Sequence, residues 1–319
     1  MEKIQAVILS ATEYLGGILW GPPMLALLIV TGVYLTVRLR GLQFTMLIHA
    51  LRLAFSDKGK NDHGEDEGDI SHFQALMTAL ASTVGPGNIA GVATAVVAGG
   101  PGAIFWMWIT GLLGMATKFA EAVAGVHYRI KMPNGEMSGG PMYYIYYGLK
   151  SISGTRWLAS PLAYCFAAFL VLGVLGVGGL VLSNAVADAM RSTFQTPTYI
   201  TGILLAVFVA LVILGGIKRI GNTSSRLVPL MIALYVGTGL VILLKNYAVI
   251  PEMFGMIFDG AFSGTAAVGG FAGAAVKEAL RFGLARGVFS NESGLGTSPI
   301  AAAAAKTKLL VEQALVSMT

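Results

Sequence analysis

The stretch Ser82-Thr83-Val84-Gly85-Pro86-Gly87-Asn88-Ile89-Ala90-Gly91 lies in the middle of an apolar segment that covers residues 73–98. Proline removes an N–H and clashes with the preceding turn, and its two flanking glycines tolerate almost any dihedral angles. We therefore expect the helix to open between Gly85 and Gly87. Unsatisfied peptide groups cost several kcal/mol each in hydrocarbon, so an opened backbone must be buried in protein or line a polar cavity. Secondary transporters use such breaks as binding sites.

The chain has the composition of a membrane protein. Of its 319 residues, 55% are hydrophobic and 12% are charged, whereas about a quarter of the residues of a soluble domain are charged. Seven apolar stretches approach or exceed the roughly 20 residues that a membrane-spanning helix needs. They cover residues 20–40, 73–98, 102–126, 160–190, 200–217, 227–245 and 262–286. Membrane β-barrels have alternating segments of about ten residues instead, so we predict an all-α, polytopic membrane helical bundle.

Lysine and arginine residues follow the odd-numbered spans, which predicts the orientation of the chain. These residues are Arg38, Arg40, Arg52, Lys58, Lys60, Arg129, Lys131, Lys150, Arg156, Lys218, Arg219, Arg226, Arg286, Lys306 and Lys308. Positive residues stay on the cytoplasmic side, so we expect a multi-pass protein of the plasma membrane with its N-terminus outside. The net charge of +5 follows from this bias, and we infer no nucleic-acid partner from it. We see no removable signal peptide before the first span.

A second glycine-rich stretch, Val268-Gly269-Gly270-Phe271-Ala272-Gly273-Ala274-Ala275, follows five spans later. Broken helices at corresponding positions of two halves indicate an inverted repeat. Glycines also gather in the fourth span, and there we expect them to let neighbouring helices approach closely. They are Gly173, Gly176, Gly178 and Gly179.

The opened helix has the chemistry of a site for a cation and a zwitterion. Sodium prefers oxygen ligands, and the break offers main-chain carbonyls that have lost their helical partners. Thr83 and Asn88 add side-chain oxygens beside these carbonyls. The half-helix that starts near Asn88 presents free N–H groups and a partial positive charge, which suit a carboxylate. The alternative is a kinked helix that packs against its neighbours.

Enzymatic functions find no support in the sequence. The glycines at positions 85, 87 and 91 do not have the spacing of a dinucleotide fingerprint, which also requires a preceding strand. The histidines are scattered without paired metal-ligand spacing, and no serine or cysteine lies in a nucleophile elbow. We therefore predict that the protein is not an enzyme and has no cofactor apart from a coupling ion.

Charged residues inside the predicted spans should face protein or water. Lys118 and Glu121 are three residues apart, so we expect them to form an ion pair. Lys277, Glu278 and Arg281 lie in the cytoplasmic half of the seventh span, where we expect a role in gating or packing. The cytoplasmic insert at residues 127–157 contains turn-rich pieces and four tyrosines between 142 and 148. We interpret its second half as an interfacial or re-entrant helix under the bundle.

Four stretches of the chain resemble the alanine or glycine:cation symporter family. They are Asp69-Ile70-Ser71-His72-Phe73-Gln74-Ala75-Leu76, the break from Gly85 to Gly91, Gly99-Gly100-Pro101-Gly102-Ala103-Ile104-Phe105-Trp106-Met107-Trp108, and Arg286-Gly287-Val288-Phe289-Ser290-Asn291-Glu292-Ser293-Gly294-Leu295-Gly296. The likeness covers nearly the whole chain. It implies a leucine-transporter-like inverted-repeat fold with an extra N-terminal helix, and symport of alanine or glycine with sodium.

The resemblance also implies which residues bind. Thr83 and Asn88 would help to hold one sodium ion, and the carbonyls of Ala81 and Val84 would hold a second. The substrate would lie against the break and against the second glycine-rich stretch. The substrate-binding residues are then Thr83, Gly85, Pro86, Gly87, Asn88, Phe271, Ala272 and Gly273.

These expectations divide the chain into five segments. They are an N-terminal interfacial segment (1–19), a first span with its cytoplasmic connection (20–55), a polar loop (56–70), a first repeat of five spans (71–245), and the start of a second repeat (246–319). Family members continue through further helices, whereas this chain stops at Thr319. We therefore expect a fragment with an incomplete second repeat, which does not transport by itself.

The leading hypothesis is a secondary active transporter that imports a small neutral amino acid together with sodium across the lipid bilayer. A proton-coupled transporter of the same fold is the nearest alternative, although nothing in the opened stretch titrates near neutral pH. A non-transporting receptor or assembly subunit is an alternative from another class. A channel would show a ring of charges or repeated filter loops, and we find neither in the sequence.

Overall fold

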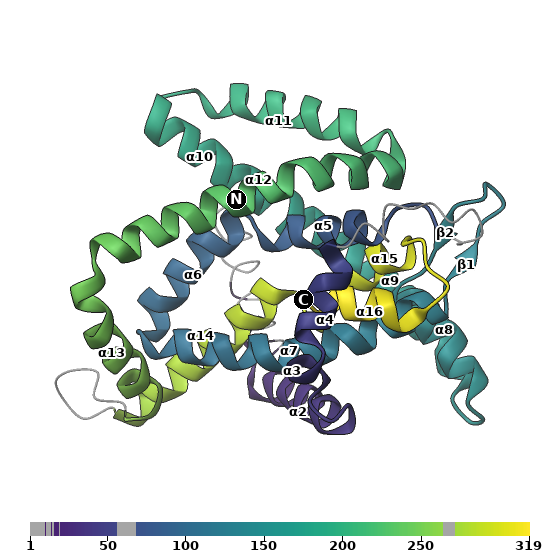
Figure 1. The fold of residues 1–319 in the computed structure, drawn as a ribbon, viewed down its shortest axis with the longest axis horizontal. Coiled ribbons are helices and arrows are strands. Elements are labelled where there is room, and N and C mark those ends of the chain that lie inside the picture. The colour runs from purple at the N-terminus through teal and green to yellow at the C-terminus, as the bar shows by residue number, and fades with distance from the viewer. Residues whose placement is uncertain (1–9, 11–13, 15, 19, 56–67, 264–271) are drawn as a thin grey trace.

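The protein is built of helices, with one short β-hairpin (Figure 1). The computed structural model describes residues 10, 14, 16–18, 20–55, 68–263 and 272–319. The described elements are α2 (Pro22–Arg38), α3 (Leu42–Thr45), α4 (Leu47–Phe55), α5 (His72–Thr83), α6 (Pro86–Gly99), α7 (Gly102–His127), β1 (Ile130–Lys131), β2 (Met137–Ser138), α8 (Pro141–Ser151), α9 (Arg156–Gly173), the π-helix η2 (Val174–Val181), α10 (Leu182–Phe194), α11 (Thr198–Ile213), α12 (Gly216–Lys245), the 3₁₀-helix η3 (Tyr247–Val249), α13 (Ile250–Phe262), α14 (Ala272–Asn291), α15 (Ser298–Ala303) and α16 (Leu310–Met318). The prediction of a helical bundle is confirmed.

Within the described residues, four helices are long and apolar enough to cross a membrane. They cover Gly16–Arg38, Gly102–His127, Arg156–Phe194 and Gly216–Lys245. The pair α5 and α6 makes a fifth span if its two halves, which are bent by 43°, are counted together. Five of the predicted spans thus correspond to helices of sufficient length, and the protein is a multi-pass membrane protein.

Two predicted spans differ from the expectation. Helix α11 has 16 residues and is about 24 Å long at 1.5 Å per residue, which is shorter than the roughly 30 Å hydrocarbon core. The predicted seventh span, 262–286, lies partly outside the described residues. Its described part, α14, carries Lys277, Glu278 and Arg281, so it is not apolar enough to span by composition.

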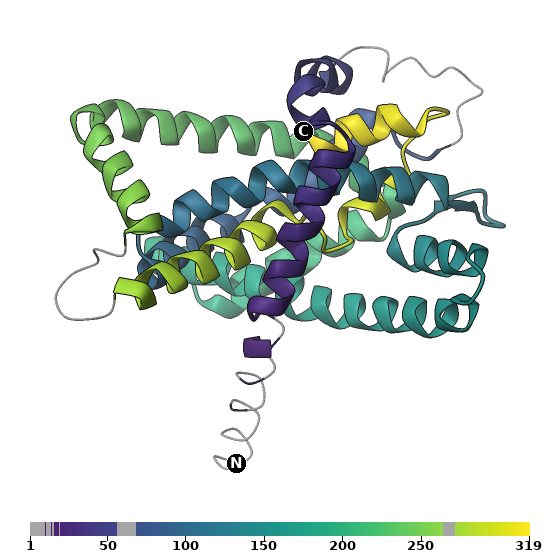
Figure 2. The ribbon, with the colours of Figure 1, turned by 90° about the horizontal axis from the view of Figure 1, so that it is seen from below.

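Helix α7 forms the centre of the molecule, and α14 runs beside it (Figure 2). Small residues on its buried faces allow the neighbouring backbones to approach closely. A Cβ atom built on Gly287 of α14 would lie 1.8 Å from the Thr110 hydroxyl of α7, and one built on Gly102 would lie 2.3 Å from the backbone of Gly260 in α13. Phe119 and its buried neighbours on α7 pack on α16 at the other end. Helix α7 thereby positions the two helices, α14 and α6, that form the candidate site.

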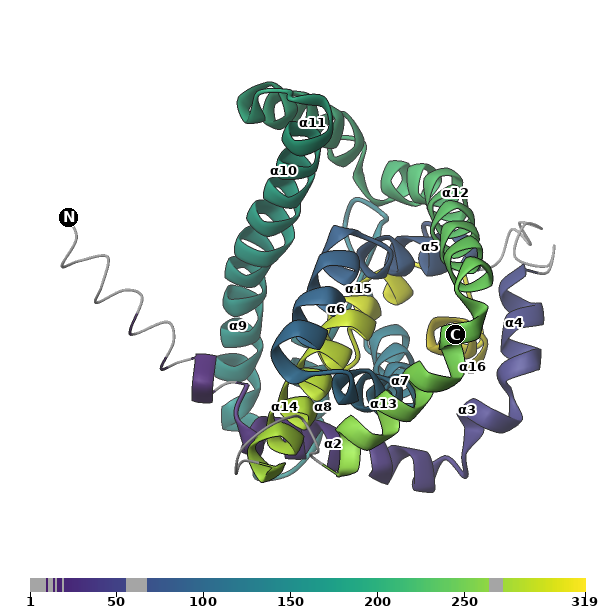
Figure 3. The ribbon, with the colours of Figure 1, turned by 90° about the vertical axis from the view of Figure 1, so that its left-hand side faces the viewer.

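Helices α9 and α10, joined through η2, form one long rod at the edge of the molecule (Figure 3). The glycines of this rod do not make the close helix contacts that the sequence predicts. A Cβ atom on Gly173 or Gly176 would meet no atom within 4 Å, and one on Gly179 would meet the Val174 carbonyl at 3.9 Å. The expectation is corrected for the described glycines Gly173, Gly176 and Gly179. Gly173 ends α9, and the other two lie in η2, whose described residues Val174, Leu175, Leu180 and Val181 are all more than half exposed.

A set of hydrogen bonds closes one end of the bundle. The strands β1 and β2 enclose the predicted turn, in which the Met132 N–H donates to the Glu136 carbonyl at 2.8 Å. The Ile70 and Ala305 backbones form a parallel bridge. The guanidinium of Arg129 donates to three carbonyls, those of Ala303 (3.0 Å), Ala305 (2.7 Å) and Thr307 (3.0 Å). The helix α8, predicted as an interfacial helix, packs on α9 beside this end.

Candidate functional site

The break in the apolar segment 73–98 is present in the structure. Helix α5 ends at Thr83, Val84 and Gly85 are non-helical, and α6 begins at Pro86. Gly85 is fully extended, with φ −155° and ψ 176°. A break is confirmed, but it lies at Val84 and Gly85 and not over the predicted stretch from Gly85 to Gly87. The helix restarts at Pro86 because the fixed φ and missing N–H of proline suit the first position of a helix.

The hydrogen-bond ladder changes at the break. The Val84 N–H donates to the Leu80 carbonyl at 2.8 Å, and the next helical bond runs from the Asn88 N–H to the Gly85 carbonyl at 2.9 Å. The Ser82 carbonyl would pair with the N–H of residue 86 in a continuous helix, and proline has none. The Thr83 carbonyl accepts from the side-chain amide of Asn88 instead. The break therefore presents carbonyl oxygens that are not tied into a helix.

Asn88 connects three helices through its side-chain amide. Its Nδ2 donates to the carbonyl of Thr83 in α5 and to the carbonyl of Ser290 in α14, the latter at 3.1 Å. Its Oδ1 accepts from Nη2 of Arg286 at 2.9 Å. Asn88 thus holds the C-terminal half of α14 against the break.

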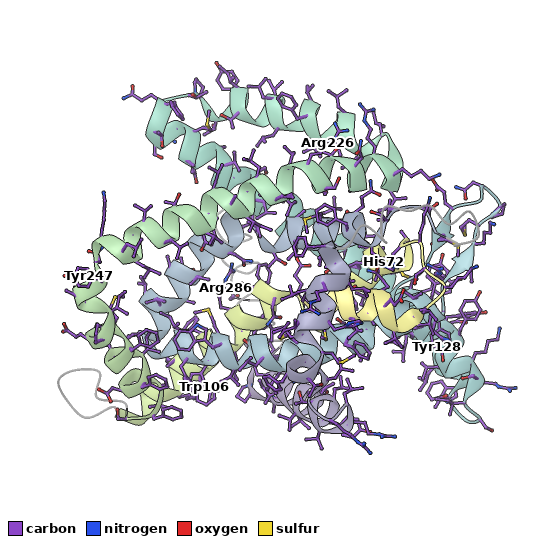
Figure 4. The ribbon with its side chains drawn as sticks, in the orientation of Figure 1. His72, Trp106, Tyr128, Arg226, Tyr247 and Arg286 are labelled. Atoms are coloured by element: carbon purple, nitrogen blue, oxygen red, sulfur yellow. The ribbon has the colours of Figure 1, made fainter. Side chains whose placement is uncertain are left out.

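Arg286 is the site residue that the sequence reasoning missed. Its side chain lies between α14 and α6 (Figure 4), with the guanidinium over Gly91 and 4.9 Å from the centre of the Phe289 ring. The orientation argument counted Arg286 as a cytoplasmic residue after the seventh span. In the structure Arg286 is inside α14 and contacts the break, and its membrane side stays a prediction. The available signal was the position of Arg286 at the end of the predicted seventh span, because charges within a predicted span mark candidate functional sites.

Thr83 places a buried polar atom at the break. Its hydroxyl oxygen is buried and has no hydrogen-bond partner among the described residues. A buried hydroxyl without a partner loses its hydration without compensation. A cation at the break would restore an interaction for this oxygen. Within the described ranges no group of three or more His, Cys, Asp or Glu residues could hold a metal.

The structure places the predicted site residues in two groups. Thr83, Val84, Gly85 and Asn88 come together at the break, with Pro86 and Gly87 in the first turn of α6 and Ala81 on the exposed last turn of α5. Phe271 lies outside the described residues. Ala272 and Gly273 begin α14, and the structure does not bring them to the break.

The relative direction of α6 and α14 explains this separation. Gly99, at the end of α6, lies against Phe282 and the Glu278 carbonyl, whereas Asn88, near its start, contacts Ser290. The two helices therefore run antiparallel. Ala272 is about 27 Å from Ser290 along α14 at 1.5 Å per residue. The assignment of Ala272 and Gly273 to the substrate site stays a prediction.

The residues that follow Ser290 bind α7, not the break. Asn291 Nδ2 donates to the Thr110 carbonyl at 3.1 Å, and the Ser293 hydroxyl donates to the Gly114 carbonyl at 3.0 Å. Glu121 accepts from the Gly294 N–H at 3.2 Å. This contact corrects the expected ion pair of Glu121 with Lys118, which does not form within the 4.0 Å salt-bridge distance in the described chain. The salt bridge of α14 joins Arg281 to Glu278 at 3.7 Å.

A cavity of about 250 Å³ lies between α2, α7 and α14, apart from the break. Its walls are largely apolar, and Glu121, Thr110 and Ser293 add polar groups to them. None of the predicted substrate or cation ligands lines it. The candidate site therefore remains the break with its partner residues on α14.

These features define a class of protein: a multi-pass membrane protein of helices, one of which is interrupted at a polar site as in secondary transporters. Comparison of the sequence with known families identifies the family within this class. The chain belongs to the sodium:alanine symporter family, whose model matches residues 4–319. This is a family of transporters, which confirms the predicted resemblance and the prediction that the protein is not an enzyme.

Curated relatives support the family membership. The chain is 53% identical to the sodium/alanine symporter AgcS of Methanococcus maripaludis, over 97% of the chain and 66% of that protein. It is 51% identical to an uncharacterized transporter of Haemophilus influenzae, over 98% of the chain and 65% of that protein. It is 37% identical to the probable sodium/glutamine symporter GlnT of Bacillus subtilis, over 94% of the chain and 59% of that protein. The chain thus spans about two thirds or less of the length of these relatives.

Proposed function

We propose that the complete protein is a secondary active transporter that imports a small neutral amino acid, alanine or glycine, together with sodium across the plasma membrane. The hydroxyl of Thr83 at the helix break, which has no hydrogen-bond partner in the part of the chain that the structure describes, is the observation that supports this most directly. Membership of the sodium:alanine symporter family supports the choice of cargo. We further propose a leucine-transporter-like inverted-repeat fold and an N-terminus outside the cell.

The coupling ion would bind at the break through neutral oxygens. Thr83 would supply its hydroxyl and Asn88 its side-chain oxygen to one sodium ion. Sodium prefers such oxygen ligands over nitrogen or sulfur. A second ion would use the carbonyls of Ala81 and Val84.

The substrate carboxylate would bind at the start of α6. The partial positive charge of a helix N-terminus favours an anion. Pro86 has no N–H, and the N–H groups of Asn88 and Ile89 already donate to the Gly85 carbonyl at 2.9 and 3.3 Å. We therefore expect the carboxylate to bind the N–H of Gly87. The sequence predicted several free N–H groups near Asn88, and we now propose that the carboxylate uses the one of Gly87.

Sodium entry supplies enough free energy for accumulation. One charge that moves inward across 100 mV releases about 2.3 kcal/mol. This corresponds to a roughly 50-fold concentration ratio of a neutral substrate, because each 1.4 kcal/mol is tenfold. A single sodium ion per substrate is therefore sufficient for active uptake.

Uptake by the complete protein in liposomes tests the proposal. We expect radiolabelled alanine or glycine to accumulate under an inward sodium gradient, and not under an equal choline gradient. The panel should include D-alanine and glutamine, the latter because of the likeness to a probable glutamine symporter. Uptake that follows a pH gradient and ignores sodium would favour proton coupling. Absence of uptake for every substrate would favour a receptor or assembly subunit.

A further inference from the structure

The break already contains a positive charge that belongs to the protein. The guanidinium of Arg286 donates to Oδ1 of Asn88, an oxygen assigned above to a sodium ion. We propose that Arg286 is a tethered cation that competes with sodium for Asn88 and locks α14 to the break while the ion is absent. This inference rests on the proposed sodium coupling.

The packing of α14 on α6 fixes the guanidinium at this place. A Cβ atom on Gly91 would lie 2.1 Å from Cζ of Arg286 and 2.3 Å from both of its terminal nitrogens. The guanidinium therefore occupies space that a glycine leaves open on α6, one turn after Asn88. On its other side it faces the ring of Phe289, at 4.9 Å from the centroid, in a favourable cation–π arrangement.

Both cations would have to share one atom of Asn88, because the amide nitrogen only donates, here to the carbonyls of Thr83 and Ser290, and Oδ1 is the acceptor. A sodium ion on Oδ1 would be within a few ångströms of the guanidinium, and two positive charges repel strongly at that distance in a partly buried site. Sodium binding at Asn88 therefore requires the guanidinium to leave.

Displacement of Arg286 would change the contact between the two helices. In the structure, α14 is joined to Asn88 by Arg286 and by the Ser290 carbonyl. When sodium removes the first of these contacts, α14 is held to the break by the second. Ion binding then loosens one helix from another, which is a local change that can be passed to a larger movement.

Two variants distinguish the effect of the guanidinium charge of Arg286 from the effect of its position beside Asn88. The Arg286→Gln substitution removes the guanidinium charge, and Gly91→Ala keeps the charge but displaces it from its position over α6. Arg281→Gln is the matched control, because Arg281 is on the same helix and pairs with Glu278 at 45% and 39% side-chain exposure rather than with Asn88. Sodium affinity is measured by calorimetry on the complete purified protein, with choline chloride holding the ionic strength constant.

We expect sodium to bind about fivefold or more tightly to Arg286→Gln and to Gly91→Ala, because the competitor has been removed or displaced. Arg281→Gln should bind as the unsubstituted protein does. Unchanged or weaker binding in both Arg286→Gln and Gly91→Ala would overturn the inference. If Arg286→Gln does not fold, the sodium affinity of Gly91→Ala decides the test. If the unsubstituted protein accumulates substrate with sodium and the variants show no tightening, the inference fails while the proposed function stands. Sodium-independent uptake would overturn both.

Discussion

At the scale of single residues, Asn88 and Thr83 have different tasks at the same break. The amide of Asn88 makes hydrogen bonds to α5 and α14, so it contributes to the fold whether or not an ion is present. The hydroxyl of Thr83 has no partner among the described residues and contributes nothing comparable. A substitution at Thr83 can therefore separate ion binding from stability.

Thr83→Val removes the hydroxyl and keeps the shape of the side chain. We expect sodium affinity to fall by about tenfold or more, because one oxygen ligand is lost, while the sodium-free melting temperature stays unchanged or rises. Thr78→Val is the control on the same helix, since its hydroxyl donates to the Gln74 carbonyl at 2.7 Å, within α5. Calorimetry and thermal unfolding without sodium provide the two measurements. Equal sodium affinity in Thr83→Val and the unsubstituted protein would remove Thr83 from the site.

At the scale of elements, the site depends on how closely α14 packs on α7. Gly287 is one residue from Arg286 and faces the Thr110 hydroxyl on α7. This close approach sets the distance between α14 and α7. It thereby places Arg286 where its guanidinium can donate to Asn88. The side chains of Asn291 and Ser293 then fasten the end of α14 to α7.

Gly287→Ala should destabilise the protein, because the new methyl would lie 1.8 Å from the Thr110 hydroxyl. Overpacking of this kind costs about 1–3 kcal/mol. Gly111→Ala on α7 is the matched control, since a Cβ atom there meets nothing within 4 Å, and alanine favours a helix over glycine. Chemical denaturation of both variants in detergent measures the difference. A Gly287→Ala variant as stable as Gly111→Ala would contradict the packing described here.

At the scale of the whole molecule, Arg129 connects parts of the chain that are far apart in sequence. Its guanidinium holds the carbonyls of Ala303, Ala305 and Thr307. The neighbouring bridge between Ile70 and Ala305 adds the segment before α5. This end of the bundle is thereby closed by backbone and guanidinium contacts instead of by apolar packing alone.

Arg129→Ala should open this end, because three charge-assisted hydrogen bonds are lost. Hydrogen bonds to charged groups contribute about 1.5–3 kcal/mol each, although not additively. We expect a lower melting temperature and faster thiol labelling of a Thr307→Cys reporter, which is buried beside Arg129. Arg156→Ala is the control, because its contact with the Lys150 carbonyl is exposed. Unchanged labelling in Arg129→Ala would show that the end is closed by other contacts.

Local chemistry explains what could be predicted from the sequence. The break at Gly85 and Pro86 follows from a missing N–H and from glycine's backbone freedom, and the turn at residues 133–136 follows from the same two residue types. The lengths of most spans follow from the apolar runs. The family resemblance, carried by short specific motifs, is likewise a property of the sequence alone.

Contacts between distant segments could not be predicted in this way. Arg286 and Asn88 are 198 positions apart, and no local pattern indicates that one guanidinium lies over a particular glycine of another helix. The antiparallel course of α6 and α14, which takes Ala272 and Gly273 away from the break, is decided by packing on α7. The same packing brings Glu121 to the N–H of Gly294, from which it accepts a hydrogen bond. The sequence by itself determined where the helix opens, because that depends on adjacent residues; the tertiary structure decided which charge is placed at the opening, because that depends on how whole helices pack.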